Sequence, residues 1–313
     1  MGGKHATEWL ETDAAGVVRA AGLLSAGRCV ALPTETVYGL AARADDAEAV
    51  AAIYRAKGRP DFNPLIVHVS DASRAARLAH LDHHAQMLAT RFWPGPLTMV
   101  LPLRDGAGIA PAVTAGLATI ALRVPAHPAM RAVLHASGLA LAAPSANRSG
   151  FISPTTPQHV AATLDGRIAA IMDGGACNSG VESTIVALRD EGWSLLRPGP
   201  IARDSLAELL GDPLPGGVQG IEAPGQMTSH YAPGKPMRLN ASEAQGDEYL
   251  IGFGAVTGDC TLSASGDLAE AAARLYACLH DAAAASQPVI AVAPLPQDGL
   301  GAAINDRLRR AAA

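Results

Sequence analysis

The stretches Leu32-Pro-Thr-Glu-Thr-Val-Tyr-Gly-Leu40 and Lys57-Gly-Arg-Pro-Asp-Phe-Asn-Pro-Leu-Ile-Val-His68 decide how this chain is interpreted. The first ends an apolar segment in a turn that carries hydroxyls and a carboxylate. The second places two cations, an amide and an imidazole close together in the sequence. Such groups suit an anionic ligand that bears phosphate or carboxylate groups. One of the few lysines in the chain, Lys57, lies here.

The bulk composition predicts a globular protein with two domains. The chain has 313 residues, of which 49% are hydrophobic and 17% charged, and this length allows two cores. The net charge of −5 argues against a protein that coats nucleic acid with a broad basic surface. No apolar run approaches the roughly 20 residues that span a bilayer, and the polar segment 1–13 does not resemble a secretory signal. We therefore expect a cytoplasmic protein that does not contact the membrane.

The four cysteines, Cys29, Cys177, Cys260 and Cys278, lie far apart in the sequence. No pair has the spacing of a metal site or of a redox motif. Free cysteine behaves as a small buried hydrophobic residue. We therefore expect all four to be ordinary small side chains.

The pattern along residues 14–202 predicts an α/β domain with a twisted mixed sheet, because strands and helices mix without strict alternation. Asp46 is expected to cap a helix that ends at Lys57. The other expected helices cover 14–26, 83–92, 127–136 and 157–163, and the expected strands cover 29–32, 65–69, 98–103, 119–124, 139–143, 169–172, 183–188 and 194–197.

A change of composition follows the first domain. Glycine and proline punctuate a long connection, which is predicted as a linker or lid over 203–235. A smaller α/β domain of the βαβ (Rossmann-like) type is expected over 236–313. Its expected strands cover 236–240, 248–253 and 288–293, and its expected helices begin at Asp267 and Ala302.

Three motifs have both a structural and a functional interpretation. Lys57-Gly58-Arg59 is typical of a helix end, where cations favour the dipole and glycine adopts the left-handed conformation, yet both cations can also project into a pocket. Thr119 and Arg123 share one face of a strand, which faces either water or a ligand. Ser145 and Asn147 follow an apolar strand among small residues, either as a polar turn or as a place where a ligand approaches the backbone.

Several other kinds of site are excluded. The chain has neither a Walker A sequence nor a nucleophile elbow. The glycines of 252–258 are spaced one residue too widely for a dinucleotide fingerprint. His80, His83 and His84 lack an acidic partner and a metal-ligand spacing, so we expect them to face solvent. We therefore expect no metal site built by the protein.

Seven segments, in order, resemble the threonylcarbamoyl-AMP synthase family (the YrdC-like fold), and they cover about residues 14–200. Any one of them is a weak signal, whereas seven in order are highly specific. The segments 224–233 and 299–308 resemble the longer, two-domain form of the family. The seven are Pro33-Thr-Glu-Thr-Val-Tyr-Gly39, Lys57-Gly-Arg59, Phe62-Asn-Pro-Leu-Ile-Val-His68, Phe92-Trp-Pro-Gly-Pro-Leu-Thr98, Arg123-Val-Pro125, Pro144-Ser-Ala-Asn147 and Glu182-Ser-Thr184.

The resemblance implies an enzyme that makes L-threonylcarbamoyladenylate from L-threonine, bicarbonate and ATP with release of pyrophosphate. The product would serve the threonylcarbamoyladenosine modification at tRNA position 37, through a downstream threonylcarbamoyl transferase complex and without direct need for tRNA. Magnesium is expected with ATP, held mostly by phosphate and water. By resemblance, the catalytic group is Lys57, Arg59, Ser145 and Asn147. ATP would contact Arg59, Asn63, Thr119, Ser145, Ser153, Arg197 and Tyr231, and threonine would contact Thr36, His68, Arg123, Ala143 and Ser183.

Two alternatives remain open at this point. One is an RNA-binding module of the same fold, which the net charge and the 4% aromatic content disfavour. The other is a carbamoyl transferase that acts on another amine. The linker departs from the family pattern at Thr228 and Ser229, where the family usually carries basic residues that could contact phosphate.

Overall fold

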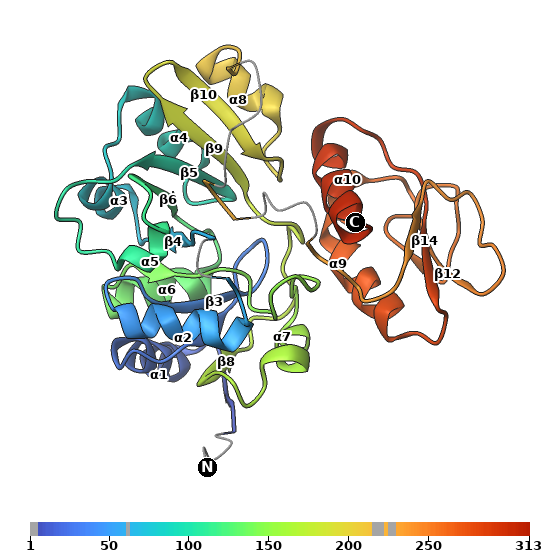
Figure 1. The fold of residues 1–313 in the computed structure, drawn as a ribbon, viewed down its shortest axis with the longest axis horizontal. Coiled ribbons are helices and arrows are strands. Elements are labelled where there is room, and N and C mark those ends of the chain that lie inside the picture. The colour runs from blue at the N-terminus through green and yellow to red at the C-terminus, as the bar shows by residue number, and fades with distance from the viewer. Residues whose placement is uncertain (1–5, 61–62, 215–221, 225–229) are drawn as a thin grey trace.

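The computed structural model describes residues 6–60, 63–214, 222–224 and 230–313. It consists of two domains that lie side by side, with the chain passing from the larger to the smaller near residue 230 (Figure 1). This arrangement agrees with the expected α/β architecture and its second, smaller domain. No helix among the described residues is both long and apolar enough to cross a membrane.

The larger domain is built on a 10-stranded sheet with the order β1-β8-β2-β3-β7-β4-β6-β5-β9-β10. Both parallel and antiparallel pairs occur in it; for example, β4 is parallel to β6 and antiparallel to β7. The mixed sheet was expected. The strands are β1 (Glu8–Leu10), β2 (Val30–Leu32), β3 (Gly39–Arg43), β4 (Ile66–His68), β5 (Leu97–Pro102), β6 (Thr119–Arg123), β7 (Leu141–Ala142), β8 (Ala170–Met172), β9 (Thr184–Arg189) and β10 (Gly192–Arg197).

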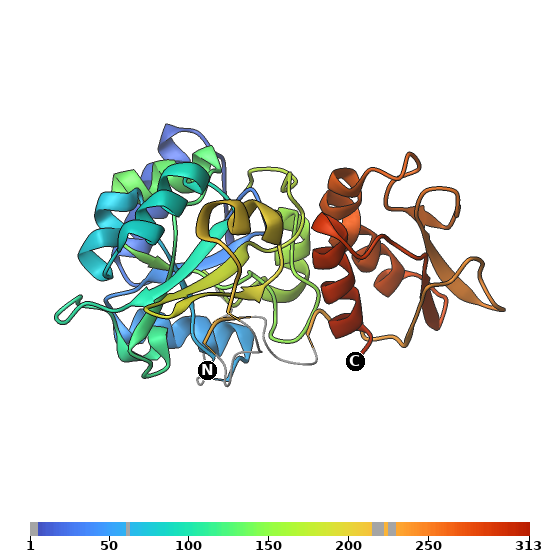
Figure 2. The ribbon, with the colours of Figure 1, turned by 90° about the horizontal axis from the view of Figure 1, so that it is seen from above.

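Helices cover the sheet on both faces (Figure 2). Side-chain alternation along β4 and β6 places Val67 and Leu122 in the main apolar core. It turns His68 and Arg123 to the opposite face, where they pair in register. The helices of this domain are α1 (Ala14–Ser25), α2 (Ala47–Lys57), α3 (Ala72–Leu78), α4 (His83–Phe92), α5 (Pro111–Thr114), α6 (Pro128–Ser137), α7 (Pro157–Leu164) and α8 (Arg203–Leu210).

Short elements account for most differences from the expected structure. The sequence pattern did not predict β1, β3, α3 or α5, which have between three and seven residues. α8 packs against α4 and buries Leu206 in the main core, so this part of the predicted linker 203–235 packs with the first domain. The exposed positions of His80, His83 and His84 confirm that they face solvent.

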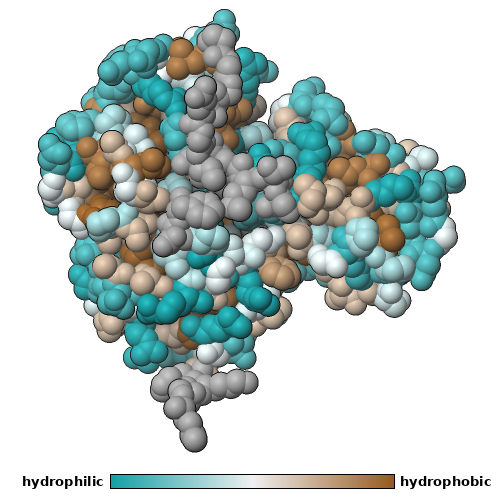
Figure 3. Space-filling view, in the orientation of Figure 1, coloured by the Kyte–Doolittle hydropathy of each residue, from teal (hydrophilic) through white to brown (hydrophobic). Residues whose placement is uncertain are grey.

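The smaller domain has a parallel sheet of four strands in the order β11-β14-β12-β13. This confirms the expected βαβ character. Its helices lie between this sheet and the first domain (Figures 1 and 2), while hydrophilic residues line its outer edge (Figure 3). The elements are β11 (Met237–Leu239), β12 (Glu248–Gly252), β13 (Cys260–Thr261), β14 (Val289–Val292), α9 (Leu268–Ala284) and α10 (Gly299–Ala311).

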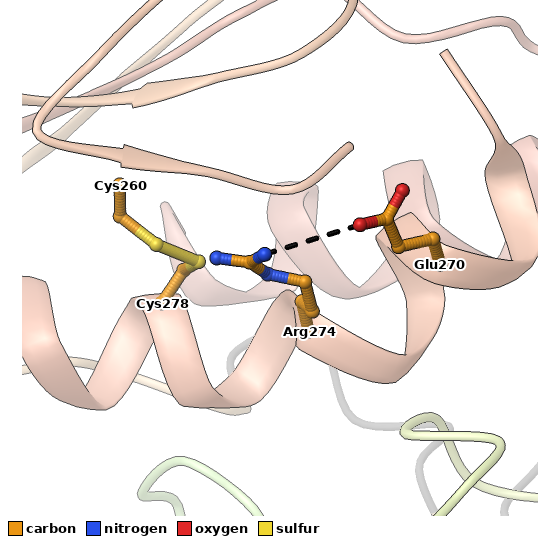
Figure 4. Close-up of a disulfide and its surroundings, with 4 residues drawn as sticks. All are labelled: Cys260, Glu270, Arg274 and Cys278. Atoms are coloured by element: carbon orange, nitrogen blue, oxygen red, sulfur yellow. Dashed lines mark ion pairs between the residues drawn. A yellow bond between two sulfur atoms is a disulfide. The ribbon is translucent and has the colours of Figure 1, made fainter. Parts of the chain in front are cut away.

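The expectation that all four cysteines are free is wrong. Cys260 of β13 and Cys278 of α9 form a disulfide across 18 residues of sequence (Figure 4). The pairing arises because α9 packs on β13, which no spacing rule reveals. The two remaining cysteines, Cys29 and Cys177, are free and buried, as expected.

Loss of the disulfide is expected to destabilise the smaller domain. A loop of this size contributes about 3 kcal/mol by restricting the unfolded chain. Replacing Cys260 and Cys278 with serine should therefore lower the denaturation midpoint, and so should adding a reductant to the native protein. The reductant should have no effect on the double serine variant, and an equal shift in both proteins would contradict the disulfide.

Candidate active site

A cavity opens where β4 and β6 meet the loops after β2, β7 and β8 and the segment that begins at His230. Its wall contains the guanidinium groups of Arg59, Arg123 and Arg197, and all three side chains are at least nine-tenths buried. Three buried cations around one hollow favour an anionic ligand. The other lining residues are Thr34, Thr36, Val37, Gly39, Ile66, His68, Ala143, Pro144, Ser145, Glu182, Ser183, Pro224, His230 and Tyr231.

Arg123 is held rigidly at one end of the cavity. It donates hydrogen bonds to Oε1 of Glu35 at 2.6 Å, to Oγ1 of Thr36 at 2.9 Å and to the carbonyl of Gly95 at 3.2 Å. Burial alone would raise the pKa of Glu35, but Arg123 keeps that pKa below its ordinary value. The guanidinium is thus pre-oriented, with a fixed counter-ion, toward a carboxylate ligand.

His68 lies beside Arg123, since the two residues pair in register on β4 and β6. Burial, assisted by the charge of Arg123, lowers the pKa of His68 well below its ordinary value, so the ring is neutral at pH 7. Both ring nitrogens are buried and lack a hydrogen-bond partner in the described part of the protein. An unpartnered imidazole in a cavity wall is suited to a polar ligand atom.

The end of α2 delivers Arg59 to the cavity. Asp46 caps the helix by accepting hydrogen bonds from the backbone N–H groups of Glu48 and Ala49, and Gly58 ends it at φ 61°, a left-handed conformation that favours glycine. The helix-end interpretation therefore applies, and of the two cations only Arg59 lines the cavity. Nη2 of Arg59 lies 3.4 Å from the carbonyl oxygen of Asn63, while Nε has no partner among the described residues.

Lys57 lies behind the cavity wall rather than in it. Its ammonium group donates to the carbonyl oxygens of Ser145 at 2.5 Å and Asn147 at 2.6 Å, and to Oδ1 of Asn147 at 3.3 Å. Burial, with the charge of Arg59 adding to it, lowers the pKa of Lys57 well below its ordinary value. In this structure Lys57 fixes the loop that presents Ser145 to the cavity.

Arg197 and Ser183, which also line the cavity, contact each other. Nη2 of Arg197 donates to Oγ of Ser183 at 3.0 Å, and Nε donates to the Ser183 carbonyl at the same distance. Oγ of Ser183 also lies 2.7 Å from Oγ1 of Thr98 on β5. These hydrogen bonds fix the side chains of Arg197 and Ser183 in the cavity wall.

Tyr231 closes part of the cavity. Only 1% of its surface is exposed, and its backbone has φ 66°, a strained conformation for a bulky residue that often marks a functional site. Its neighbours fix the segment, because the N–H of His230 donates to the Arg310 carbonyl and the N–H of Ala232 donates to the Gly150 carbonyl.

Two family models match the chain. One, Sua5_yciO_yrdC, is described as "Telomere recombination" and covers residues 22–199. The other is described as "Threonylcarbamoyl-AMP synthase, C-terminal domain" and covers residues 201–313. The chain belongs to the threonylcarbamoyl-AMP synthase family. It is thus an enzyme of that family, and the resemblance seen in the sequence is confirmed.

Individual relatives agree over nearly the whole chain. The threonylcarbamoyl-AMP synthase of Bacillus subtilis is 40% identical over 98% of this chain and 95% of its own length. The Pyrococcus abyssi protein of the same name is 38% identical over 93% and 92%. The crystal structure of P. abyssi Sua5 complexed with L-threonine superposes with a TM-score of 0.89 at 35% identity, covering 98% of both chains.

Nine of the fourteen residues that the family resemblance pointed to line the cavity, and five do not. Five lie outside the cavity lining: Lys57 and Asn147 brace the Ser145 loop, Asn63 lies beside Arg59, Ser153 contacts Glu182, and Thr119 lies at the start of β6. Those that line the cavity are Thr36, Arg59, His68, Arg123, Ala143, Ser145, Ser183, Arg197 and Tyr231.

Sequence reasoning did not identify Glu35, Glu182 or His230 as site residues. Glu35 and Glu182 stand inside matching motifs, so their position was available, but their ion pairs with arginines far away in the sequence were not. Thr228 and Ser229, where the linker departs from the family pattern, lie outside the described residues. No group of three or more metal-ligating side chains gathers in the part of the chain that the structure describes.

Proposed function

We propose that this protein condenses L-threonine, bicarbonate and ATP into L-threonylcarbamoyladenylate and pyrophosphate. The single observation that carries the proposal is the cavity lined by Arg59, Arg123 and Arg197 in a chain of this family. It combines a guanidinium pre-oriented for a carboxylate with two further cations suited to phosphate. The product would serve threonylcarbamoyladenosine formation at position 37 of tRNAs that read codons beginning with A.

The chemistry explains the charge of the cavity. Bicarbonate takes up a proton and loses water to give CO2. The threonine amine attacks the carbon of CO2 and releases a proton as the carbamate forms, so the proton taken up is returned. A carbamate oxygen then attacks the α-phosphorus of ATP, and the bond to the pyrophosphate leaving group breaks. Two anions must therefore meet in line, so the site has to neutralise charge and align the reactants. No covalent intermediate with the protein is required.

The threonine half of the cavity would be Thr36, His68, Arg123, Ala143 and Ser183. Arg123 would bind the substrate carboxylate, and neutral His68 offers ring nitrogens that no other described residue occupies.

Replacing Arg123 with lysine is expected to raise the KM for threonine by roughly 10- to 100-fold. Lysine cannot keep the forked contacts to Glu35 and Thr36, and a hydrogen bond to a charged group contributes about 1.5–3 kcal/mol. Steady-state kinetics with varied threonine would measure this. The control is Arg43→Lys, because Arg43 pairs with Asp45 on the surface of the same domain. An unchanged KM in the Arg123 variant would contradict the assignment.

The nucleotide half would be Arg59, Asn63, Thr119, Ser145, Ser153, Arg197 and Tyr231. Lys57 and Asn147 would support catalysis with Arg59 and Ser145 by fixing the loop around bicarbonate and phosphates. Magnesium would arrive with ATP. Glu182, the one carboxylate among the described residues of the cavity wall, already accepts hydrogen bonds from three side chains, which fits an ion held by phosphate and water.

We place the protein in the cytoplasm, where it would pass its product to a threonylcarbamoyl transferase complex and contact tRNA only indirectly. Detection of threonylcarbamoyl-adenylate by mass, in a mixture of ATP, bicarbonate and threonine, tests the proposal directly. Pyrophosphate release that does not depend on threonine would favour a carbamoyl transferase for another amine. Binding of tRNA without binding of ATP or threonine would favour an RNA-binding module.

A further inference from the structure

The smaller domain places three side chains against residues of the candidate site. Arg307 comes from α10, and Tyr276 and His280 come from α9, the two helices that face the first domain (Figure 1). Arg307 is fully buried, as is Tyr276. Their main target is Glu182, which lies 94 residues before Tyr276 and 125 before Arg307.

Glu182 is saturated by these contacts. Its Oε2 accepts hydrogen bonds from Nε of Arg307 at 2.9 Å and from the hydroxyl of Tyr276 at 2.8 Å. Its Oε1 accepts one from Oγ of Ser153 at 2.6 Å. Arg307 also donates to the carbonyl of Pro198 at 2.9 Å. A carboxylate that is fixed by several hydrogen bonds can in turn orient Ser153, whose hydroxyl donates a hydrogen bond to it.

The smaller domain contacts the nucleotide half in two further places. Nε2 of His280 lies 3.2 Å from the carbonyl oxygen of Ser153. The guanidinium carbon of Arg307 lies 5.7 Å from the ring centroid of Tyr231, within the range of a cation–π contact. Ser153 and Tyr231 both belong to the residues assigned to ATP.

Arg123 and Thr36, in the threonine half, do not depend on contacts with the smaller domain. Among the described residues, the side-chain hydrogen bonds of Arg123 and Thr36 all go to Thr34, Glu35, Thr36, Gly95 or Arg123 of the first domain. Arg123 and Thr36 are thus held by the larger domain, while the side chains of the smaller domain contact Ser153, Glu182 and Tyr231.

We infer that Arg307 and Tyr276 are positioning residues that act through Glu182, so that the smaller domain sets the affinity for ATP but not the affinity for threonine. This inference rests on the proposed function, because it uses the assignment of Ser153 and Tyr231 to the nucleotide. Neither Arg307 nor Tyr276 lines the cavity, so each acts on the substrate through another side chain.

The variant Tyr276→Phe provides the cleanest test, since it removes one hydroxyl and keeps the buried ring. We expect the Kd for magnesium–ATP, measured by calorimetry, to rise about tenfold, as befits the loss of a hydrogen bond to a charged group. The Kd for threonine should change less than about twofold. The control Tyr249→Phe, on β12 of the same domain, should leave both constants unchanged.

Two further variants separate positioning from stability. Combining Tyr276→Phe with Glu182→Gln should weaken ATP binding no more than Glu182→Gln alone, because residues that act through one another are not additive. Arg307→Met should make ATP binding sensitive to pH, whereas the surface variant Arg274→Met should not.

The pH effect has a defined sign. Burial alone would raise the pKa of Glu182, but Arg307 and Arg197 hold that pKa at about 2, so the carboxylate stays charged in the native protein. Tyr276, Tyr231 and His230 also face it, and none of them supplies a positive charge at neutral pH. Without Arg307 the pKa of Glu182 should rise, so ATP binding should weaken as the pH falls from 8 to 5.5.

Each outcome is decisive. If Tyr276→Phe weakens ATP and threonine binding equally, or lowers the melting temperature while both Kd values stay unchanged, the inference is overturned. If the native protein binds both ligands but forms no product, the proposed function fails while the binding constants still decide the inference. If the native protein binds no ATP, both are refuted.

Discussion

Replacing Arg59 with lysine is expected to reduce the formation of threonylcarbamoyl-adenylate by about 100-fold or more. The reaction brings a carbamate to a triphosphate, and removing one pre-oriented donor from developing negative charge commonly costs about that much in rate. A lysine ammonium is a point charge on a flexible stem and cannot make the forked contact of a guanidinium. The substitution therefore keeps the positive charge but removes the forked contact geometry.

The surroundings of Arg59 support that expectation. The side chain is only 9% exposed, and it lies just after the glycine that ends α2. Burial lowers its pKa to about 10, so it still carries its charge at pH 7. Its Nε has no partner among the described residues, which leaves a donor for the ligand.

The measurement is single-turnover product formation, followed by mass. Arg55→Lys is the matched control, since Arg55 lies in the last turn of α2, shortly before Arg59, and pairs loosely with Glu48 on the surface. Full turnover in the Arg59 variant would remove this residue from the mechanism.

Much of the fold could be predicted from local patterns. The strands β4 to β6 and the helices α1, α2, α4 and α6 follow from apolar periodicity and from caps such as Asp46. The short strands could not be predicted in this way. β3, for example, starts at Gly39, inside the motif that was interpreted as a turn, and its pairing with β2 and β7 is a tertiary interaction.

The residues of the candidate site could likewise be predicted only where they lie in a recognisable local motif. Motif order pointed to most of the nine predicted residues that line the cavity, because all of them except Ala143 and Arg197 lie in a short conspicuous segment. It could not identify the partnership of Glu182 with Arg307, since two residues so far apart give no signal in a single sequence until the domains pack. The disulfide between Cys260 and Cys278 escaped prediction for that reason too. The unrecognised residues are those that link one domain or element to another.

The second large effect is expected from truncation. Deleting residues 220–313 should reduce product formation by more than 100-fold, because it removes Tyr231 from the cavity and also removes Arg307 and Tyr276, which hold the Glu182 carboxylate in place. The deletion also uncovers Val37, Ile152 and Val181, which pack in one apolar cluster with α9 and α10.

The comparison requires a truncated protein that is folded, which circular dichroism and a cooperative melting transition would establish. The full-length variant with Cys260 and Cys278 replaced by serine is the control, since it weakens the smaller domain without removing its contacts to Glu182. That variant should keep most of its activity below its melting temperature. Full synthesis by the folded truncated protein would show that the larger domain alone aligns ATP with the carbamate. Close packing at Gly180 argues against this outcome, because a Cβ there would lie 2.2 Å from the carbonyl oxygen of Ala272 on α9. The loop that carries Glu182 is therefore shaped against the smaller domain.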